Sequence, residues 1–181
     1  MSKLESDKYR SGQKALTHKE LDKLMEVIDN IEDELLIILA VTTGLRREDL
    51  CSVKTKNIDL QEGTLTFHES KKNKDRTIYL SPKAVTLISK FLKTQEKRDN
   101  LFSFCGRTAY RHFNYWCRIA KIPERPFHAL RATCTKFCHD AGWTDPQISD
   151  LTGDSIRVIQ QHYMTPSRGE MKQAAQEKPI I

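Results

Sequence analysis

The amino-acid sequence predicts an α+β fold that is mostly α-helical and contains one small three-stranded antiparallel sheet. Apolar residues recur at helical spacing along most of the 181-residue chain, and several of these segments begin at N-cap residues. Three short segments near the middle of the chain have strand composition instead, and turn residues separate them. The length fits a single domain with a short arm.

The N-terminal part of the folded region is predicted to be helical. Thr17 and Glu20 have the spacing of a capping box, and apolar residues follow at helical intervals. A second helix is predicted over residues 33–42, where a long apolar run indicates burial on most sides. Gly44 interrupts this helix, and a further helical turn is predicted over 45–50.

The strands are predicted over residues 58–60, 64–68 and 76–80. Glu62-Gly63 provides a turn between the first two, and the polar residues 70–75 provide the turn between the last two. Strands joined by such short turns pair antiparallel, so the three form a small meander.

The rest of the chain is predicted to be helical. Ser81 and Pro82 have the pattern of an N-cap followed by proline at the first helical position. The helix that they begin has an apolar face formed by Val85, Ile88, Phe91 and Leu92. Further helices are predicted over 108–122, 128–141 and 146–151, and a last segment over 155–164.

The pattern divides the chain into three parts. Residues 1–15 are polar and lack periodicity, so they are predicted to be a flexible leader or linker. Residues 16–164 form the predicted domain, and residues 165–181 form a C-terminal tail. The longest apolar run has seven residues, far fewer than the ~20 that cross a bilayer, and no secretory signal pattern begins the chain. We therefore expect a soluble, cytoplasmic protein.

The charge balance favours an anionic partner. Lysine and arginine outnumber aspartate and glutamate by 30 to 24, which gives a formal net charge of +6. Nucleic acid is the commonest partner of a basic domain, although charge alone does not separate it from other anions.

The five cysteines are expected to be reduced thiols. Cys134 and Cys138 are four residues apart and His139 follows, which could place two thiolates on one helix face. A structural zinc site needs four ligands, however, and no second pair has a suitable spacing. We therefore expect buried free cysteines and no metal site.

Two motifs contain arginines that could bind a phosphate. Thr43-Gly44-Leu45-Arg46, followed by Asp49-Leu50, ends a buried helix at a glycine and presents the planar guanidinium of Arg46 next. His128-Ala129-Leu130-Arg131 places His128 and Arg131 on one face of a helix, so both could contact the same phosphate. The N-terminal amides of that helix also favour an anion.

Two further motifs contain a possible acid and a possible nucleophile. The polar turn Ser70-Lys71-Lys72-Asn73-Lys74-Asp75-Arg76 joins the last two predicted strands. Tyr163 follows Gly153 by ten residues, a context that the other four tyrosines lack. Taken singly, the polar turn could be an ordinary solvated turn, and Tyr163 could be a core tyrosine.

Together the four motifs resemble the tyrosine recombinases, the phage-integrase family of DNA strand-exchange enzymes. The order arginine, lysine, His-x-x-Arg, tyrosine and the intervals between them are those of the family, and the resemblance covers residues 16–164. It implies a tyrosine recombinase catalytic-domain fold. It also implies a site-specific recombinase that cleaves and rejoins double-stranded DNA through a 3′-phosphotyrosine intermediate, usually as a tetramer, with no cofactor or metal.

The resemblance also implies roles for individual residues. Arg46 and Arg131 would hold the scissile phosphate, and His128 would bind it or relay a proton. Tyr163 would be the nucleophile, and Lys71 would be the general acid at the leaving 5′ oxygen. DNA phosphates would be contacted by Lys72, Lys74 and Arg76.

Asp154 departs from the family pattern, which has histidine or tryptophan directly after the glycine. An ionised aspartate cannot donate a hydrogen bond to the phosphate. We expect Asp154 to turn away and pair with Arg157; the alternative is that it accepts the proton of Tyr163. Ala132 also replaces a frequent histidine, which we attribute to packing.

Other interpretations remain open at this point. A type IB topoisomerase shares the catalytic set, and a DNA-binding module that has lost catalysis would explain Asp154. A metal-stabilised regulatory domain is the third alternative. The N-terminal core-binding domain of the family is not found in the sequence, which fits either the catalytic part of a longer integrase or a compact recombinase. The tail 165–181 is either a segment exchanged between partners or a frayed end.

Overall fold

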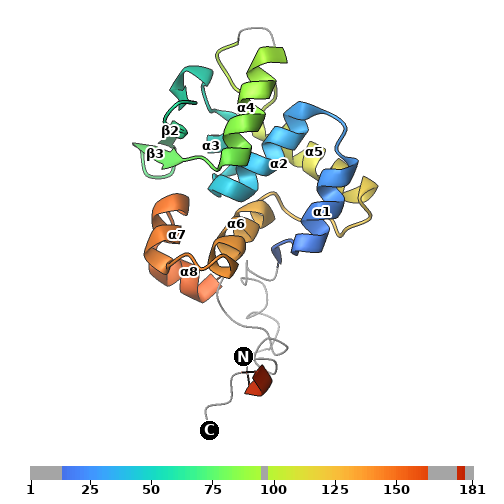
Figure 1. Ribbon diagram of the computed structural model, residues 1–181, viewed down its shortest axis with the longest axis vertical. Coiled ribbons are helices and arrows are strands. Elements are labelled where there is room, and N and C mark those ends of the chain that lie inside the picture. The colour runs from blue at the N-terminus through green and yellow to red at the C-terminus, as the bar shows by residue number, and fades with distance from the viewer. Residues whose placement is uncertain (1–13, 95–97, 163–174, 178–181) are drawn as a thin grey trace.

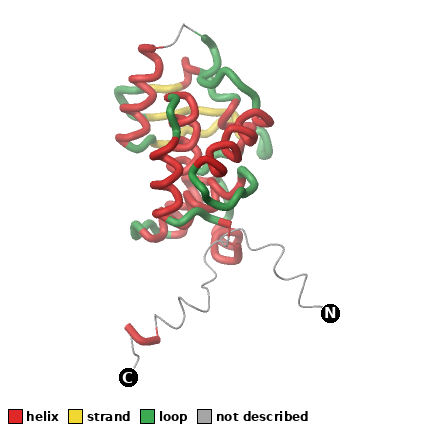
Figure 2. The backbone as a smooth tube through the Cα atoms, turned by 90° about the vertical axis from the view of Figure 1, so that its right-hand side faces the viewer, coloured by secondary structure: helices red, strands yellow, loops and turns green. Residues whose placement is uncertain are grey.

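The computed structural model describes residues 14–94, 98–162 and 175–177 (Figure 1). The described chain is mostly helical and contains a three-stranded antiparallel sheet of order β1-β2-β3, so the predicted fold class is confirmed. The strands lie in one half of the molecule and are flanked by helices (Figure 2). The predicted site residue Tyr163 lies outside the described residues, as does most of the predicted tail.

The helices before the sheet have the caps that the sequence predicts. Helix α1 (His18–Val27) begins at the capping box of Thr17 and Glu20. Helix α2 (Ile31–Thr43) begins two residues before the predicted start, because the Asn30 side chain accepts a hydrogen bond from the Asp33 amide at 2.8 Å. Helix α3 (Arg47–Cys51) follows directly, and the short 3-10 helix η3 (Thr55–Asn57) leads into the sheet.

The sheet consists of β1 (Ile58–Asp59), β2 (Thr64–Glu69) and β3 (Lys74–Tyr79). Strand β3 begins two residues before its predicted start, because its Lys74 still pairs with Glu69 of β2. The turn between β2 and β3 is therefore only residues 70–73. Side chains of β2 alternate between buried and more exposed positions.

The helices after the sheet are α4 (Pro82–Thr94), α5 (Gly106–Ile119), α6 (His128–Asp140), α7 (Asp145–Thr152) and α8 (Ile156–His162). Helix α5 begins and ends earlier than predicted, whereas α6 and α7 agree with prediction to within about one residue. None of the helices in the described ranges has both the length and the hydropathy needed to cross a bilayer.

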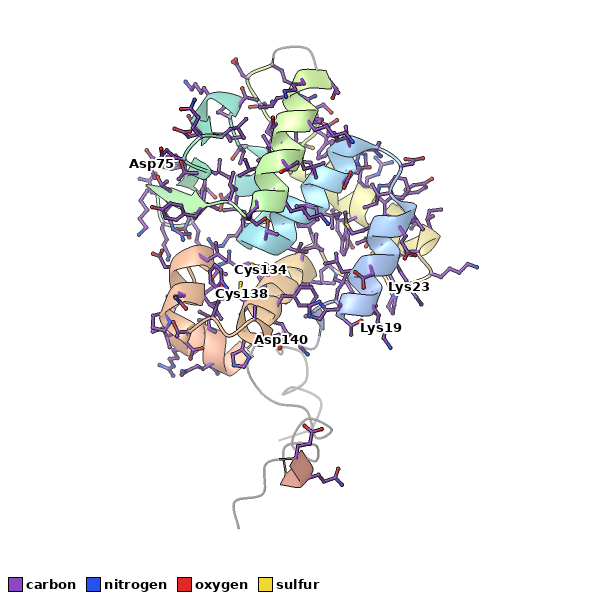
Figure 3. The ribbon with its side chains drawn as sticks, in the orientation of Figure 1. Lys19, Lys23, Asp75, Cys134, Cys138 and Asp140 are labelled. Carbon is purple, nitrogen blue, oxygen red and sulfur yellow. The ribbon has the colours of Figure 1, made fainter. Side chains whose placement is uncertain are left out.

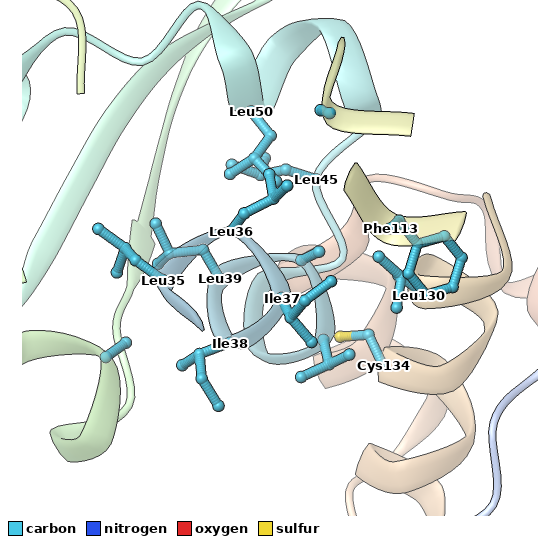
Figure 4. Packing of buried hydrophobic residues seen from close by; sticks show 14 of the residues in the cluster. Leu35, Leu36, Ile37, Ile38, Leu39, Leu45, Leu50, Phe113, Leu130 and Cys134 are labelled. Carbon is cyan, nitrogen blue, oxygen red and sulfur yellow. The ribbon is translucent and has the colours of Figure 1, made fainter. Parts of the chain in front are cut away.

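Helix α2 lies at the centre of the core. Residues 35–39 point in different directions around the helix and are almost fully buried, so neighbours cover every face (Figure 4). Leu45 and Leu50 cover one side, and Phe113 of α5 with Leu130 and Cys134 of α6 cover another.

A smaller cluster attaches helices α7 and α8 to α6. It consists of Ala15, Ala132, Ile148 and Ile159, all at most 9% exposed. Ala15 belongs to the predicted leader, yet it is buried here, so the packed domain begins at the last residues of that segment. Ala132 is fully buried, which agrees with the packing role expected for it.

Candidate active site

The structure brings Arg46 and Arg131 together, although 85 positions of sequence separate them. Arg46 is the N-cap of α3, and Arg131 lies in the first turns of α6. Both guanidinium groups contact one carboxylate, Asp154. The distances to its Oδ1 are 2.7 Å from Nη2 of Arg131 and 3.5 Å from Nη2 of Arg46. Arg131 is 3% exposed, and the Arg46 side chain is 25% exposed.

Gly44 makes this arrangement possible. It ends α2 in the left-handed conformation with φ of 62°, and its carbonyl oxygen accepts a hydrogen bond from Nη1 of Arg131. A Cβ atom at this position would lie 3.1 Å from the Thr152 side chain and 3.2 Å from Sγ of Cys134. The glycine therefore allows both the chain reversal and the close packing of α2 against α6 and α7.

The first turn of α6 and the start of α3 form the walls of a cleft of about 440 Å³. The predicted residues Arg46, His128 and Arg131 line it, together with Ser70 and Tyr110. A larger cleft of about 750 Å³ runs along α5 and includes none of the predicted site residues. The smaller cleft thus contains three of the predicted residues, and Lys72, Lys74, Arg76 and Asp154 line another cleft of about 410 Å³.

His128 is the first residue of α6 and lies at the exposed rim of the cleft. The surrounding protein lowers its pKa below the ordinary value, mainly through burial of part of the ring and then through the charge of Arg131. Arg46 acts in the same direction, and Asp154 opposes it. A lowered pKa keeps the imidazole neutral at pH 7, and the neutral form is the one that can accept a proton as a base.

Asp154 is not paired as expected. The sequence predicted an Asp154–Arg157 pair, but the carboxylate binds the two cleft arginines instead, with Oδ2 also 3.1 Å from Nε of Arg131. That prediction is wrong because contacts with Arg131 of α6 and with Arg46 at the start of α3 replace the local i, i+3 contact. Burial raises the pKa of Asp154, but the hydrogen bond and charge of Arg131, with the charge of Arg46, outweigh burial and lower it.

Glu69 is a second buried carboxylate of the site, and it was missing from the sequence prediction. It is 0% exposed, and its Oε1 lies 2.6 Å from Nη1 of Arg46 and 3.9 Å from Nζ of Lys72. Its Oε2 lies 3.5 Å from Nη1 of Arg76. Burial raises the pKa of Glu69, whereas the hydrogen bond from Arg46 and the nearby cations lower it, and the net shift is downward.

Asp49 fixes the start of the hairpin turn. Its buried Oδ1 accepts hydrogen bonds from the backbone amide of Ser70 at 3.2 Å and from the Ser70 hydroxyl at 2.6 Å. Asp49 follows Arg46 by three residues, so helix α3 positions the arginine and the hairpin together. The turn that carries Lys71 and Lys72 is thereby attached to the arginine site.

The four basic residues of the hairpin have different environments. Lys71 and Lys74 are exposed to solvent. Lys72 is 43% exposed, and its ammonium group donates to the carbonyl oxygen of Gly153 as well as lying near Glu69. The structure therefore places Lys72, rather than Lys71, beside Glu69, the carboxylate that binds Arg46.

Arg76 connects the hairpin to the C-terminal end of α7. Its Nη2 donates to the carbonyl oxygens of Asp150 and Leu151, and its guanidinium lies 5.6 Å from the centre of the Phe67 ring. Its side chain is 12% exposed. Gly153, with φ of 77°, leaves room for it, because a Cβ atom there would overlap Nη1 of Arg76. These contacts favour a positioning role for Arg76 over the predicted phosphate contact.

Cys134 and Cys138 both belong to α6 (Figure 3). Cys134 is fully buried between α2 and α6, as expected, and Cys138 is half-buried; both are free thiols. Within the described part of the chain, no group of three or more histidine, cysteine or acidic residues is arranged to hold a metal ion.

Glu69→Gln tests the buried carboxylate. At pH 7 we expect the free energy of unfolding to fall by about 2 kcal/mol, because three cations lose their counter-charge. The pKa of Glu69 is lowered in the folded state, so its contribution is present above the unfolded-state pKa and is lost as pH falls through the folded-state value. Urea unfolding at pH 7 and below pH 4 should show the two proteins converging in acid. Glu62→Gln, in an exposed turn, is the control, and an equal loss in both variants would contradict the role of Glu69.

The fold and the site define a tyrosine recombinase catalytic domain. The chain belongs to the phage integrase family, whose family model matches residues 14–169. It is 34% identical over 182 residues to the tyrosine recombinase XerA of Pyrococcus horikoshii, covering 95% of this chain and 64% of that protein. It is 29% identical over 180 residues to XerA of Pyrococcus furiosus, covering 93% and 63%.

Solved structures have the same fold. The crystal structure of a XerA recombinase superposes with a TM-score of 0.79 at 22% identity, over 92% of this chain and 66% of that one. The Tn1549 transposon integrase in complex with a circular intermediate DNA gives 0.70 at 16% identity, over 90% and 65%. The chain spans just under two thirds of the length of the two Pyrococcus XerA proteins.

Proposed function

We propose that the chain is the catalytic domain of a site-specific DNA recombinase that cleaves and rejoins strands through a 3′-phosphotyrosine. The observation that supports this most directly is that Arg46 and Arg131 converge on one carboxylate, that of Asp154, and that both arginines line a cleft together with His128. Two guanidinium groups that bind one carboxylate can bind a phosphate in the same way. The family membership and the DNA-bound relative support DNA as the source of that phosphate.

Cleavage then requires three contributions from the protein. The two arginines neutralise the charge that develops on the non-bridging oxygens. Tyr163 attacks phosphorus, and because a tyrosine of pKa ≈ 10 is ionised only about one part in a thousand at pH 7, the site must supply roughly 4 kcal/mol. Neutral His128 can accept or relay that proton. The phosphotyrosine bond conserves the energy of the broken ester, so rejoining needs no nucleotide cofactor.

The leaving 5′ oxygen takes its proton from the β2–β3 hairpin. Lys71 is the candidate by its place in the motif, and its exposed ammonium is available to approach DNA. Lys72 is the second candidate, because it contacts Glu69, the same residue that binds Arg46. Lys74 is exposed on the hairpin and supplies a phosphate contact outside the reaction.

Recombination also requires an assembly of domains. We propose that the domain acts as a tetramer on two DNA duplexes, in the cytoplasm where the DNA is. The tail 165–181 is the candidate for a segment exchanged between partners. A topoisomerase would instead relax supercoiled DNA by itself, and a module that has lost catalysis would bind DNA without forming any adduct.

A nicked suicide DNA substrate tests the proposal. Cleavage near the nick releases a short strand end, so religation fails and the covalent complex accumulates. A denaturing gel should show a protein–DNA adduct, and peptide mapping should locate it at Tyr163. Binding without adduct would favour the non-catalytic module, whereas relaxation of supercoiled plasmid by the lone domain would favour the topoisomerase.

The identity of the general acid gives a separate prediction. Lys71→Ala should reduce cleavage of a normal substrate by about a hundredfold, because the 5′ oxygen leaves poorly without a proton. A 5′-phosphorothiolate substrate should restore the rate, because sulfur leaves without protonation. Single-turnover cleavage of both substrates measures this. Rescue of Lys72→Ala instead would assign the acid to Lys72, and Lys74→Ala is the control, for which no rescue is expected.

A further inference from the structure

The carboxylate of Asp154 occupies the position where a phosphate is expected. Its Oδ1 lies 2.7 Å from Nη2 of Arg131 and its Oδ2 lies 3.1 Å from Nε, so it faces one edge of the guanidinium with both oxygens. Arg46 contacts the same Oδ1 at 3.5 Å. A phosphate can bind arginine through the same two nitrogens, Nε and Nη2.

The remaining edge of each guanidinium is partly occupied as well. Nη1 of Arg131 already donates to the carbonyl oxygen of Gly44, and Nη1 of Arg46 binds Glu69 at 2.6 Å. Nη2 of Arg131 is buried without a hydrogen-bond partner among the described residues, and Oδ1 of Asp154 lies 2.7 Å from it. A phosphate that binds the Nε and Nη2 edge of Arg131 would therefore have to displace Asp154. The pKa of Asp154 lies below its ordinary value, so the carboxylate is ionised near neutral pH and repels a second anion.

The geometry of the Asp154 contact is that of a competitor for the phosphate site. We propose that Asp154 is an internal phosphate surrogate that closes the arginine site, and that the DNA phosphate must displace it before cleavage. This inference rests on the proposed function only in taking DNA as the phosphate that enters.

Asp154 stands at the junction between α7 and α8, where displacement is feasible. Only Gly153, Asp154 and Ser155 separate the two helices. The backbone of Asp154 is held by two side chains of α7, with Oγ of Ser149 donating to its carbonyl oxygen at 2.7 Å and its amide donating to Oγ1 of Thr152 at 3.3 Å. The side chain can thus leave the arginines by rotation or by a local change at this junction.

Asp154→Asn is the direct test, with Asp150→Asn as the matched control. Asp150 is exposed on α7, so both variants lose one negative charge in the same region, and only Asp154→Asn weakens the contact with the arginines. Binding is measured by fluorescence anisotropy with a blunt 30-base-pair duplex of arbitrary sequence. If the open site is populated about a tenth of the time or less, Asp154→Asn should bind at least about tenfold more tightly than Asp150→Asn. Equal affinities of the two variants, or weaker binding by Asp154→Asn, would overturn the proposal.

A measurement on the unaltered chain covers the case in which Asp154→Asn does not fold. Hydrogen exchange of the amides in residues 153–158 should become faster when the duplex saturates the protein, because Asp154 no longer anchors the junction. Unchanged or slower exchange in that peptide would overturn the proposal. Both measurements report binding rather than cleavage. If the suicide substrate gives no adduct but Asp154→Asn binds DNA more tightly, the proposed recombinase activity is rejected and the proposal for Asp154 stands. If the adduct forms but the two variants bind DNA equally, the recombinase activity stands and the proposal for Asp154 is rejected.

Discussion

Tyr163→Phe is expected to abolish the covalent protein–DNA adduct while leaving DNA affinity unchanged. The substitution removes only the hydroxyl, which is the nucleophile, and no other group can form the phosphotyrosine at that position. Adduct formation on the suicide substrate should fall by at least about a thousandfold, to the background of the assay. A gel for the adduct and anisotropy for binding measure the two effects separately.

Two other tyrosines make this prediction specific. Tyr110 lines the arginine cleft and is 37% exposed, so it is the competing nucleophile among the described residues. Tyr79 is 79% exposed on β3 and serves as the control for a distant hydroxyl. Loss of the adduct in Tyr110→Phe, with its persistence in Tyr163→Phe, would show that Tyr110 of α5 is the nucleophile and would reject the spacing argument.

Local sequence patterns predicted the elements that depend on nearby residues. The capping box of Thr17 and the glycine that ends α2 are formed by neighbours in sequence, so both could be predicted. The resemblance to the tyrosine recombinases, rather than any local pattern, predicted that the two arginines act together, and the structure places them in one cleft. The strand boundaries were less accurate, because the pairing of Glu69 with Lys74 decides where the turn begins.

The partners of the site residues could not be predicted in the same way. The sequence favoured Arg157 for Asp154 because i, i+3 neighbours share a helix face, but the actual partner lies on α6, which no local rule identifies. Glu69 did have a signal. It follows Leu65 and Phe67 at alternate positions of β2, so strand periodicity places it on the buried face, where a carboxylate needs cations.

The two carboxylates have a common consequence for how the site is built. Glu69 binds one edge of Arg46 from the hairpin, and Asp154 binds Arg131 and the other Nη of Arg46 from the α7–α8 junction. The arginines are thus held in place before DNA arrives, which reduces the entropy lost when the phosphate binds. The cost is the competition with Asp154, so the same contacts that preorganise the site also oppose its ligand.

Arg131→Lys is expected to have the second largest effect on cleavage. Lysine keeps the positive charge, but it is a single point of charge. It cannot replace a planar group that donates to Gly44 through Nη1 and to Asp154 through Nε, with Nη2 also 2.7 Å from that carboxylate. The non-bridging oxygens of the transition state lose their bidentate partner, so single-turnover cleavage should fall at least about a hundredfold.

The same substitution should lower stability moderately, because Arg131 is 3% exposed and the carbonyl oxygen of Gly44 loses its buried donor. We expect a decrease of about 1–3 kcal/mol in the free energy of unfolding. Arg118→Lys is the control, because Arg118 is 59% exposed and pairs only at the surface with Glu124, so both cleavage and stability should stay near the native values. If Arg131→Lys cleaves at the native rate, charge alone suffices at this position, and the planar geometry of the guanidinium is not what the site requires of Arg131.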